Sequence, residues 1–242
     1  MTPNELIAYI IRYCEANAND ANIAKYGKFF KGGDFVGYGL TAPQIHSLVK
    51  NLLKTQGIAL DVILDATPTL LKSNNSEEIT IALLLINGFG KQYSKSLFKE
   101  IEKWYGFTIT NWAHADTLGM LILPQFLKYD VINYKELKGW ITSGHKFQRR
   151  SVPVTLIKLL KSKKVDDFAP IFSFIEPLMT DPEREVHQGV GWFLREAWKL
   201  KRQDTEKFLM KWKDTTPRLI IQYATEKMTT EEKIRFRKAT NS

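Results

Sequence analysis

The chain has 242 residues, a hydrophobic fraction of 44% and a formal net charge of +9. A chain of this length buries a core that needs no disulfide, which excludes a disulfide scaffold. Its single cysteine, Cys14, shares a helical face with Ile10 and Ile11, so we expect a buried structural thiol. The N-terminus lacks the basic start and apolar core of a signal peptide, and no uncharged apolar run reaches spanning length. We therefore expect a soluble cytoplasmic protein that does not enter a membrane.

The positive charge is confined to the second half of the chain. Residues 1–120 hold 11 Lys and Arg against 11 Asp and Glu, whereas residues 121–242 hold 24 against 15. The whole excess of +9 therefore belongs to the second half. A one-sided basic surface favours nucleic acid or another polyanion as the partner, with solubility alone as the alternative.

Helix signals follow one another along the chain. The segments 2–5 (Thr-Pro-Asn-Glu) and 41–44 (Thr-Ala-Pro-Gln) are capping boxes, so a helix is predicted to begin at each. Residues 31–39, between them, form a glycine-rich loop. Three later starts are predicted where a capping side chain precedes proline: Thr67-Pro68, Asp181-Pro182 and Thr216-Pro217.

Apolar residues between these signals return every three or four positions, as Ile45, Leu48, Val49 and Leu52 do. Strand-like alternation is almost absent, and the β-prone segment 219–223 follows Pro217 in helical surroundings, which favours a helix. We predict an all-α chain of about a dozen helices joined by short turns. Such helices form a bundle or a solenoid of stacked antiparallel helical pairs, of HEAT or armadillo type. No linker divides the chain, so a single domain over residues 1–242 is expected.

Metal and nucleotide sites have no support in the sequence. His46, His114, His145 and His187 show no metal-ligand spacing, and there is no cysteine pair, so we expect these histidines at the surface or in helix caps. The glycine-rich loop lacks a Gly-Lys-Ser/Thr ending and follows no strand. We expect no metal and no cofactor.

Trp112 and Asp116 are four residues apart and share one face of a predicted helix. They either form a core anchor with a polar neighbour or bring an indole and a carboxylate together in a site. Arg149 and Arg150 precede Pro153, which is expected to kink the helix and splay the pair. They form either a solvated basic face or a phosphate clamp suited to the forked guanidinium group.

A third cluster contains Trp192, which follows Gly189 and Gly191 inside a strongly helical segment. Each glycine costs about 1 kcal/mol relative to alanine in a helix. We therefore expect either close helix packing or an open approach to Trp192 at these positions.

In this order the three clusters resemble the DNA alkylation repair family of HEAT-like alkylpurine glycosylases, the AlkD-like group. The matching pieces are Asn111-Trp112 with Asp116, Arg149-Arg150 before an apolar helix, Gly191-Trp192-x-Leu194-Arg195-Glu196, Phe29-Phe30 with the glycine loop running into Thr41-x-Pro43, and Glu77-Glu78 opening an apolar helix. Two positions depart from the family. Ala113 stands where many members have an acidic residue after the tryptophan, and His46 stands where they have an arginine.

The resemblance implies a right-handed superhelix of stacked helical pairs whose basic concave face holds duplex DNA. A solenoid that uses one concave face usually acts alone, so we expect a monomer. The resemblance further implies excision of cationic alkylated purines such as 3-methyladenine and 7-methylguanine, with the lesion held through its backbone and deoxyribose and the base left unenclosed. By position, Asp116 matches the catalytic aspartate, and Trp112 and Trp192 match the two site tryptophans. Arg150 matches the phosphate-contacting arginine, and we expect Lys146, Arg149 and Arg195 to join it in binding DNA.

The chemistry requires little more than these groups. A purine alkylated at N3 or N7 is already cationic and leaves as a neutral base without a general acid. Asp116 would stabilise the positive charge that develops on the deoxyribose and position the attacking water. Trp112 and Trp192 would each add a cation–π attraction of about 0.5–2 kcal/mol.

Two other functions fit the same sequence. One is a non-catalytic DNA-binding relative that recognises damaged or branched DNA by shape and charge. The other is a helical-repeat scaffold for an acidic protein, in which the tryptophans are core anchors.

Overall fold

The computed structural model describes residues 1–29, 35–162 and 164–238, and every regular element in these ranges is a helix. The chain divides into two compact units, Met1–Thr117 and Leu118–Ser242, and each is described by itself. The predicted all-α class is confirmed. Among the described residues, no helix combines the length and the apolar character that crossing a membrane requires.

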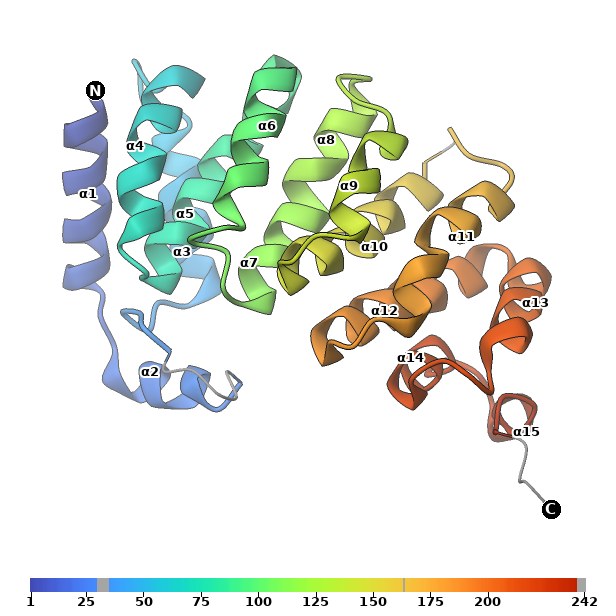
Figure 1. The fold of residues 1–242 in the computed structure, drawn as a ribbon. Helices are drawn as coiled ribbons and strands as arrows, with labels where there is room; N and C mark the ends of the chain where they lie inside the picture. Colours follow the sequence, from blue (N-terminus) through green and yellow to red (C-terminus); the bar gives the residue numbers. More distant parts are fainter. Residues whose placement is uncertain (30–34, 163, 239–242) are drawn as a thin grey trace. The chain divides into compact units, whose positions relative to one another are not determined.

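The first unit is built around α5. Its helices are α1 (Pro3–Ala16), α2 (Asp20–Gly27), α3 (Ala42–Leu52), α4 (Leu60–Lys72), α5 (Ser76–Asn87), α6 (Lys95–Trp104) and α7 (Trp112–Thr117), with a 3₁₀ turn η1 (Gly90–Gln92) before α6. α1, α3, α4 and α7 all pack against α5 (Figure 1). From Ile81 to Ile86, α5 is apolar on all sides, which is typical of a helix that is surrounded by others. These side chains are all buried. α5 is therefore the fixed element from which the rest of the unit is positioned.

The predicted helix starts at Thr2 and Thr41 are confirmed. Thr2 and Glu5 form a reciprocal capping box, and the backbone N–H of Thr41 donates to Oε1 of Gln44 at 2.8 Å. The predicted start at Thr67-Pro68 is wrong, since α4 runs through both residues. Buried Thr67 donates its hydroxyl to the carbonyl of Ile63 at 2.7 Å, so it bonds one turn back instead of capping.

The second unit is a succession of packed helices, in which α10 packs on α12 and α12 on α14 (Figure 1). It begins with a π-helical turn, η2 (Leu118–Ile122), directly after α7. The elements that follow are α8 (Leu123–Lys128), η3 (Tyr134–Leu137), α9 (Lys138–Ile141), α10 (Lys146–Leu160), α11 (Ala169–Ile175), η4 (Glu176–Thr180), α12 (Arg184–Leu200), α13 (Arg202–Trp212), α14 (Arg218–Ala224) and α15 (Thr230–Ile234). Segment 219–223 is helical, as predicted, and α10 continues through Pro153.

Gly191 allows α12 to lie close against α14. A Cβ atom at this position would stand 2.5 Å from Cβ of Tyr223 and 2.9 Å from the carbonyl oxygen of Ile220. At Gly189 it would stand 3.1 Å from Cγ of Arg150, on α10. Close packing, the first of the two expected reasons, therefore accounts for both glycines.

Candidate active site

Trp112 and Asp116 lie one turn apart on α7. Asn111 caps this helix, because its Oδ1 accepts from the backbone N–H of His114 at 3.0 Å. The Trp112 side chain is 40% exposed, and Asp116 is half-buried. An indole with this exposure is not a core anchor. α7 instead presents an aromatic face next to a carboxylate.

His114 fixes α7 on the start of α5. The ring is buried, with Nδ1 3.0 Å from Nδ2 of Asn111 and Nε2 3.3 Å from the carbonyl oxygen of Ser76. The neutral tautomer that satisfies both contacts donates from Nε2 and accepts at Nδ1. Burial lowers the His114 pKa to about 4, against the opposing effect of the Ser76 carbonyl. The prediction of a surface or cap histidine is wrong here, because the imidazole is a neutral link between two helices.

The same end of α5 holds the chain that precedes α3. The Glu77 carboxylate accepts three backbone N–H groups, from Tyr38 at 3.1 Å, Gly39 at 2.8 Å and Leu40 at 3.0 Å. Ser76 adds a fourth link by donating its N–H to the carbonyl of Val36 at 2.8 Å. A buried carboxylate with this many donors is satisfied and rigid. Ser76 and Glu77 together therefore clamp residues 36–40.

The glycines of this segment are required by that clamp. Gly39 has a φ of 78°, and a Cβ there would lie 2.3 Å from the carbonyl oxygen of Asn19. A Cβ at Gly37 would meet Oε2 of Glu77 at 2.3 Å. The expected glycine loop 31–39 is thus described from residue 35 onwards, and residues 31–34 lie outside the described ranges.

A pocket of ≈ 240 Å³ lies beside Trp112 in the first unit. Four of its walls are aromatic side chains: Tyr26, Phe29, Phe35 and Trp112. Tyr26 and Phe35 meet edge to face, with ring centroids 5.9 Å apart. Glu77 contributes the one charged side chain among the lining residues. α7, α5 and the clamped segment thus enclose a small space with aromatic walls and a negative group.

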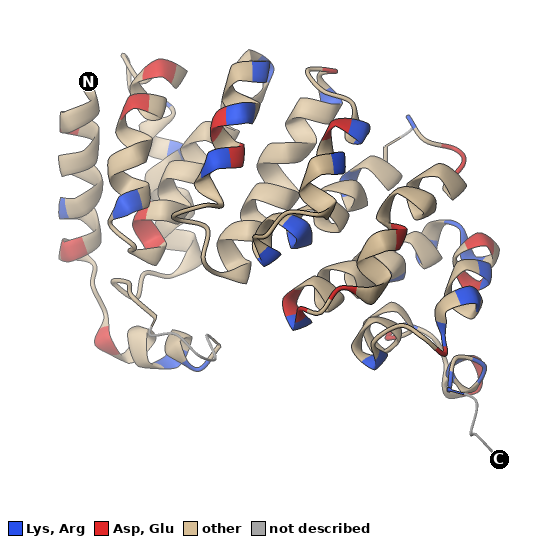
Figure 2. Ribbon diagram, viewed as in Figure 1, with Lys and Arg blue, Asp and Glu red and all other residues tan. Residues whose placement is uncertain are grey.

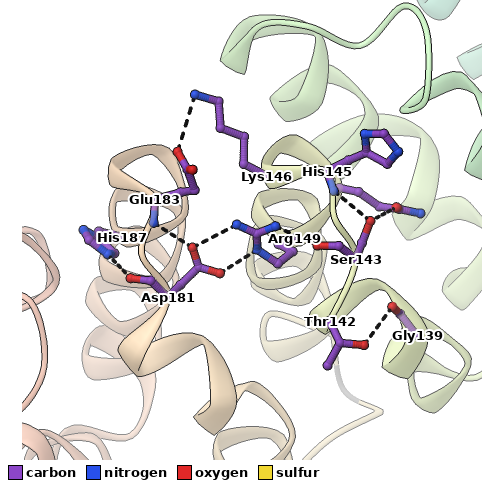
Figure 3. Close-up of polar contacts among 10 residues, drawn as sticks. Gly139, Thr142, Ser143, His145, Lys146, Arg149, Asp181, Glu183 and His187 are labelled. Atoms are coloured by element: carbon purple, nitrogen blue, oxygen red, sulfur yellow. Dashed lines mark hydrogen bonds and ion pairs between the residues drawn. The ribbon is translucent and has the colours of Figure 1, made fainter.

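In the second unit, Arg149 is held by Asp181 (Figure 3). Its Nε and one terminal nitrogen donate to the two carboxylate oxygens at 2.6 and 3.2 Å, and the other terminal nitrogen donates to the carbonyl of Ser143 at 2.6 Å. Asp181 is buried and also accepts from the N–H of Glu183 at 2.8 Å, just before α12. Arg149 therefore joins the start of α10 to the start of α12.

Arg150 also lies between α10 and α12, and it is buried. One of its terminal nitrogens donates to the carbonyl of Glu185 at 2.6 Å, and its stem packs on Gly189. Lys146 is the more open cation, with a side chain that is 37% exposed and Nζ 2.9 Å from Glu185. Its Nζ also lies 3.6 Å from Glu183 (Figure 3).

Trp192 is half-buried on α12, one turn from Arg195. Arg195 forms an ion pair with Glu226, beyond α14. The neighbouring Glu196 is buried and accepts from Lys161 and Lys199, each at 2.6 Å. Burial opposes ionisation of Glu196, but these two bonds outweigh it and lower the pKa to about 2. Glu196 is thus a structural link between α12 and the end of α10.

The structure gathers the predicted site residues into two sets. Trp112 and Asp116 share α7 in the first unit, and Lys146, Arg149, Arg150, Trp192 and Arg195 lie on the packed helices α10 and α12 in the second. Within the described ranges, no group of three or more His, Cys, Asp or Glu side chains is arranged to hold a metal ion. Cys14 is buried, and burial, reinforced by Glu77 and Glu78, raises its thiol pKa to about 12, so it is not a nucleophile.

Sequence reasoning did not identify the pocket residues Tyr26, Phe35 and Glu77 or the link made by His114. The acidic pair 77–78 can be seen in the sequence at the start of a helix. Acidic residues are common there because they stabilise the positive end of the helix dipole, so the pair does not by itself indicate a site. Tyr26 and Phe35 have no local pattern that indicates a site.

Comparison with known proteins gives a consistent result. A family model described as DNA alkylation repair enzyme matches residues 10–228. A solved structure described as a predicted DNA alkylation repair enzyme from Enterococcus faecalis is similar with a TM-score of 0.76 and 16% identity, covering 88% of this chain and 98% of that one. The crystal structure of AlkD2 from Streptococcus mutans is similar with a TM-score of 0.59 and 16% identity, covering 85% and 97%. No curated protein matches the sequence.

Proposed function

Because the chain belongs to the DNA alkylation repair enzyme family, we propose that it is a DNA N-glycosylase that releases cationic alkylated purines, such as 3-methyladenine and 7-methylguanine, from duplex DNA. The observation that carries this proposal is the arrangement on α7. Trp112 is 40% exposed although it is a large aromatic residue, and Asp116 lies one turn away on the same face. Release of the base is the first step of base excision repair.

Asp116 supplies the electrostatic part of the reaction. As the bond between the base and the deoxyribose breaks, positive charge develops on the sugar, and a fixed carboxylate stabilises it and orients the water that attacks C1′. The link from His114 to Ser76 supports this role, since it holds α7 at a set orientation on α5. The leaving purine carries its own positive charge and needs no proton donor.

The two tryptophans act on the same developing charge. The exposed indole of Trp112 and the half-buried indole of Trp192 each offer a π face for a cationic sugar or base, worth about 0.5–2 kcal/mol. Because Trp192 belongs to the second unit, its contribution requires that duplex DNA be bound by both units.

The basic residues on α10 and α12 have different roles in the proposed binding of DNA. Lys146 and Arg195 pair with carboxylates of partly exposed residues, and these can be exchanged for phosphate oxygens when DNA binds. Arg149 and Arg150 hold the two helices together through Asp181 and the Glu185 carbonyl, and so shape this surface. The proposed enzyme acts as a monomer in the cytoplasm, where the DNA is, and needs no metal.

Base release from alkylated DNA tests the proposal. The intact protein is incubated with methylated duplex DNA, and the released bases are separated and quantified. Asp116→Asn should lower the rate of 7-methylguanine release by about 10²–10³-fold, because the side chain keeps its size and loses its charge. Asp65→Asn, an exposed site on α4, is the matched control and should retain the wild-type rate. Full activity of Asp116→Asn would remove this residue from the mechanism.

A non-catalytic DNA-binding relative is the second candidate. The observation that favours it is Ala113, which places no acidic side chain directly after Trp112. This candidate predicts salt-dependent binding to damaged or branched DNA with no release of any base by the wild-type protein.

A further inference from the structure

We infer that Lys161 and Lys199, held together by Glu196, form a separate phosphate-binding site for the DNA backbone that flanks the lesion. This inference rests on the proposed function and adds to it a place where the strand is held beyond the reacting nucleotide. The Glu196 site, as we call these three residues, lies at the ends of α10 and α12. Lys146 and Arg149, in contrast, lie at the start of α10.

One carboxylate holds both lysines. Glu196 is buried, and its Oε2 accepts from Lys161 and its Oε1 from Lys199, each at 2.6 Å. The two ammonium groups are therefore close together although they come from different helices. Each ammonium group has three N–H donors, and the bond to Glu196 uses one of them. The lysine side chains are 46% and 42% exposed, so both are open to a ligand from solvent.

The charge of the Glu196 site selects an anion. Two lysines and one carboxylate sum to 2 − 1 = +1, because both lysines share the same acidic partner. Lys158, one turn before Lys161 on α10, is exposed and adds a further positive charge. Lysine binds phosphate oxygens as a point charge with several donors, so a phosphate group fits this site.

The Glu196 site is continuous with the face of α12 that carries Trp192. Arg195 follows Trp192 by three residues and Lys199 follows Arg195 by four, so the three side chains form one row along the helix. The seven residues from Trp192 to Lys199 span about 10 Å of helix. Each strand of B-DNA carries one phosphate per about 3.4 Å of its axis, so this distance corresponds to about three nucleotides.

This row identifies the source of the phosphate. A strand whose sugar lies on Trp192 and which follows α12 passes Arg195 and reaches Lys199 about three nucleotides later, where Lys161 joins from α10. The site therefore takes a phosphodiester of the damaged strand. A free nucleotide has one phosphate and would meet only one part of the row.

DNA binding tests the site without catalysis. The intact protein is titrated against labelled, undamaged duplex DNA at several salt concentrations, with anisotropy as the readout. Lys161→Gln and Lys199→Gln remove the charge and keep an amide that can donate to Glu196, so the fold is preserved. Each should weaken binding about fivefold to tenfold at about 0.1 M salt and reduce the magnitude of the salt slope by about 1. Unchanged affinity and slope in the double variant would overturn the inference.

Lys207→Gln is the matched control. Lys207 is exposed on α13, on the face opposite the buried residues Thr205 and Leu209, so it points away from the helices that α13 packs against. This variant loses the same charge and should bind duplex DNA with the wild-type affinity and slope. An equal loss in Lys207→Gln and in the two site variants would show that net charge alone sets the affinity, and would contradict a site at Glu196.

Equilibrium dialysis with guanosine monophosphate distinguishes the DNA backbone from a free nucleotide. We expect no saturable binding of the nucleotide, because one phosphate makes only a small part of the contacts that a strand makes. Saturable binding that is lost in the double variant Lys161→Gln/Lys199→Gln would assign the site to nucleotides and overturn the inference of a backbone contact.

Base release then separates this inference from the proposed function. On duplex DNA with a single 7-methylguanine, the double variant should raise KM and leave kcat unchanged, because a flanking contact is equally strong before and during the reaction. Two shortened duplexes, in which the damaged strand ends about two nucleotides before or after the lesion, locate the contact. One of them should raise the wild-type KM to the value of the double variant. An equal rise in the double variant on that duplex would contradict the inferred register.

The two proposals fail in different ways. Base release by the wild-type protein, with DNA binding that the lysine variants do not change, would contradict the Glu196 site while the glycosylase proposal stands. Weaker DNA binding by the variants, without release of any base by the wild-type protein, would contradict the glycosylase proposal while the Glu196 site stands.

Discussion

At the scale of single residues, the candidate site depends on buried polar groups that hold its segments together. His114 lies behind Trp112 and bonds to the Ser76 carbonyl and the Asn111 side chain, and Glu77, in the pocket lining, accepts from the backbone N–H groups of residues 38–40. Removing one partner of such a bond leaves a buried polar group unpaired, which costs about 1–3 kcal/mol. The position of the site is therefore sensitive to residues outside it.

His114 makes the stability of the folded chain depend on pH. Its pKa is about 4 when folded, because of burial, against 6.5 when unfolded. Between these values the unfolded chain binds more protons, so the free energy of unfolding falls as the pH falls from 6.5 to 4, by up to about 3 kcal/mol. Chemical denaturation across this range should show the fall, and His114→Gln should reduce its slope. Exposed His145→Gln is the control; an unchanged slope in His114→Gln would show that other groups cause the dependence.

At the scale of elements, α12 is the helix on which the second set of site residues depends. Arg149 and Asp181 tie its start to α10, Glu196 ties it to the end of α10, and Gly191 brings it against α14. These links are buried or partly buried, so the surface that carries Trp192 is held from three directions. Replacing only one member of an ion pair such as Arg149–Asp181 should lower the stability strongly, because the other charge stays buried without a partner.

Gly191→Ala should disturb this arrangement at a single point. The added methyl group would meet the Ile220 carbonyl and Tyr223, and overpacking of this kind costs about 1–3 kcal/mol, partly offset by about 1 kcal/mol of helix propensity. We expect a net loss of stability, measured by chemical denaturation, together with slower base release because Trp192 is adjacent. Gly139→Ala on α9, where a Cβ meets nothing within 4 Å, should be neutral or stabilising. Equal stability of both variants would show that α12 and α14 can separate without cost.

At the scale of the whole molecule, charge is divided between the two units. Residues 1–117 hold 11 basic and 11 acidic side chains, and residues 118–242 hold 24 and 15. Figure 2 shows basic and acidic segments side by side on α13 and α15. Arg202 on α13 pairs with Glu232 on α15 and with Glu206 one turn along α13. Arg235, directly after α15, also pairs with Glu206. Some of the basic side chains of the second unit are thus neutralised by acidic side chains of the same unit. The single domain and the superhelix expected from the sequence remain predictions.

Salt titration should reveal the DNA contacts of the second unit. The logarithm of the binding constant for duplex DNA should fall with the logarithm of salt concentration, with a slope of about −0.9 per phosphate contact. Lys146→Ala and Arg195→Ala should each reduce the magnitude of the slope by about 1. Lys50→Ala, an exposed lysine in the neutral first unit, should leave the slope unchanged. A salt-independent affinity in the wild type would favour the protein scaffold instead.

The sequence by itself determined the all-α class, the helix starts at Thr2 and Thr41 and the shared face of Trp112 and Asp116. Each of these follows from residues within one or two turns, where capping and periodicity act. Thr67 shows the limit of such signals, since the same side chain can cap a helix or bond one turn back.

Only the tertiary structure decided which groups the site uses as support. His114 bonds to Ser76, 38 residues earlier, and Arg149 pairs with Asp181, 32 residues later. The pocket joins Tyr26, Phe35 and Trp112 from three separate segments. Such contacts arise from helix packing, so no local pattern predicts them. The physical reason is that burial, which makes the imidazole neutral and the carboxylate a clamp, exists only after the helices have come together.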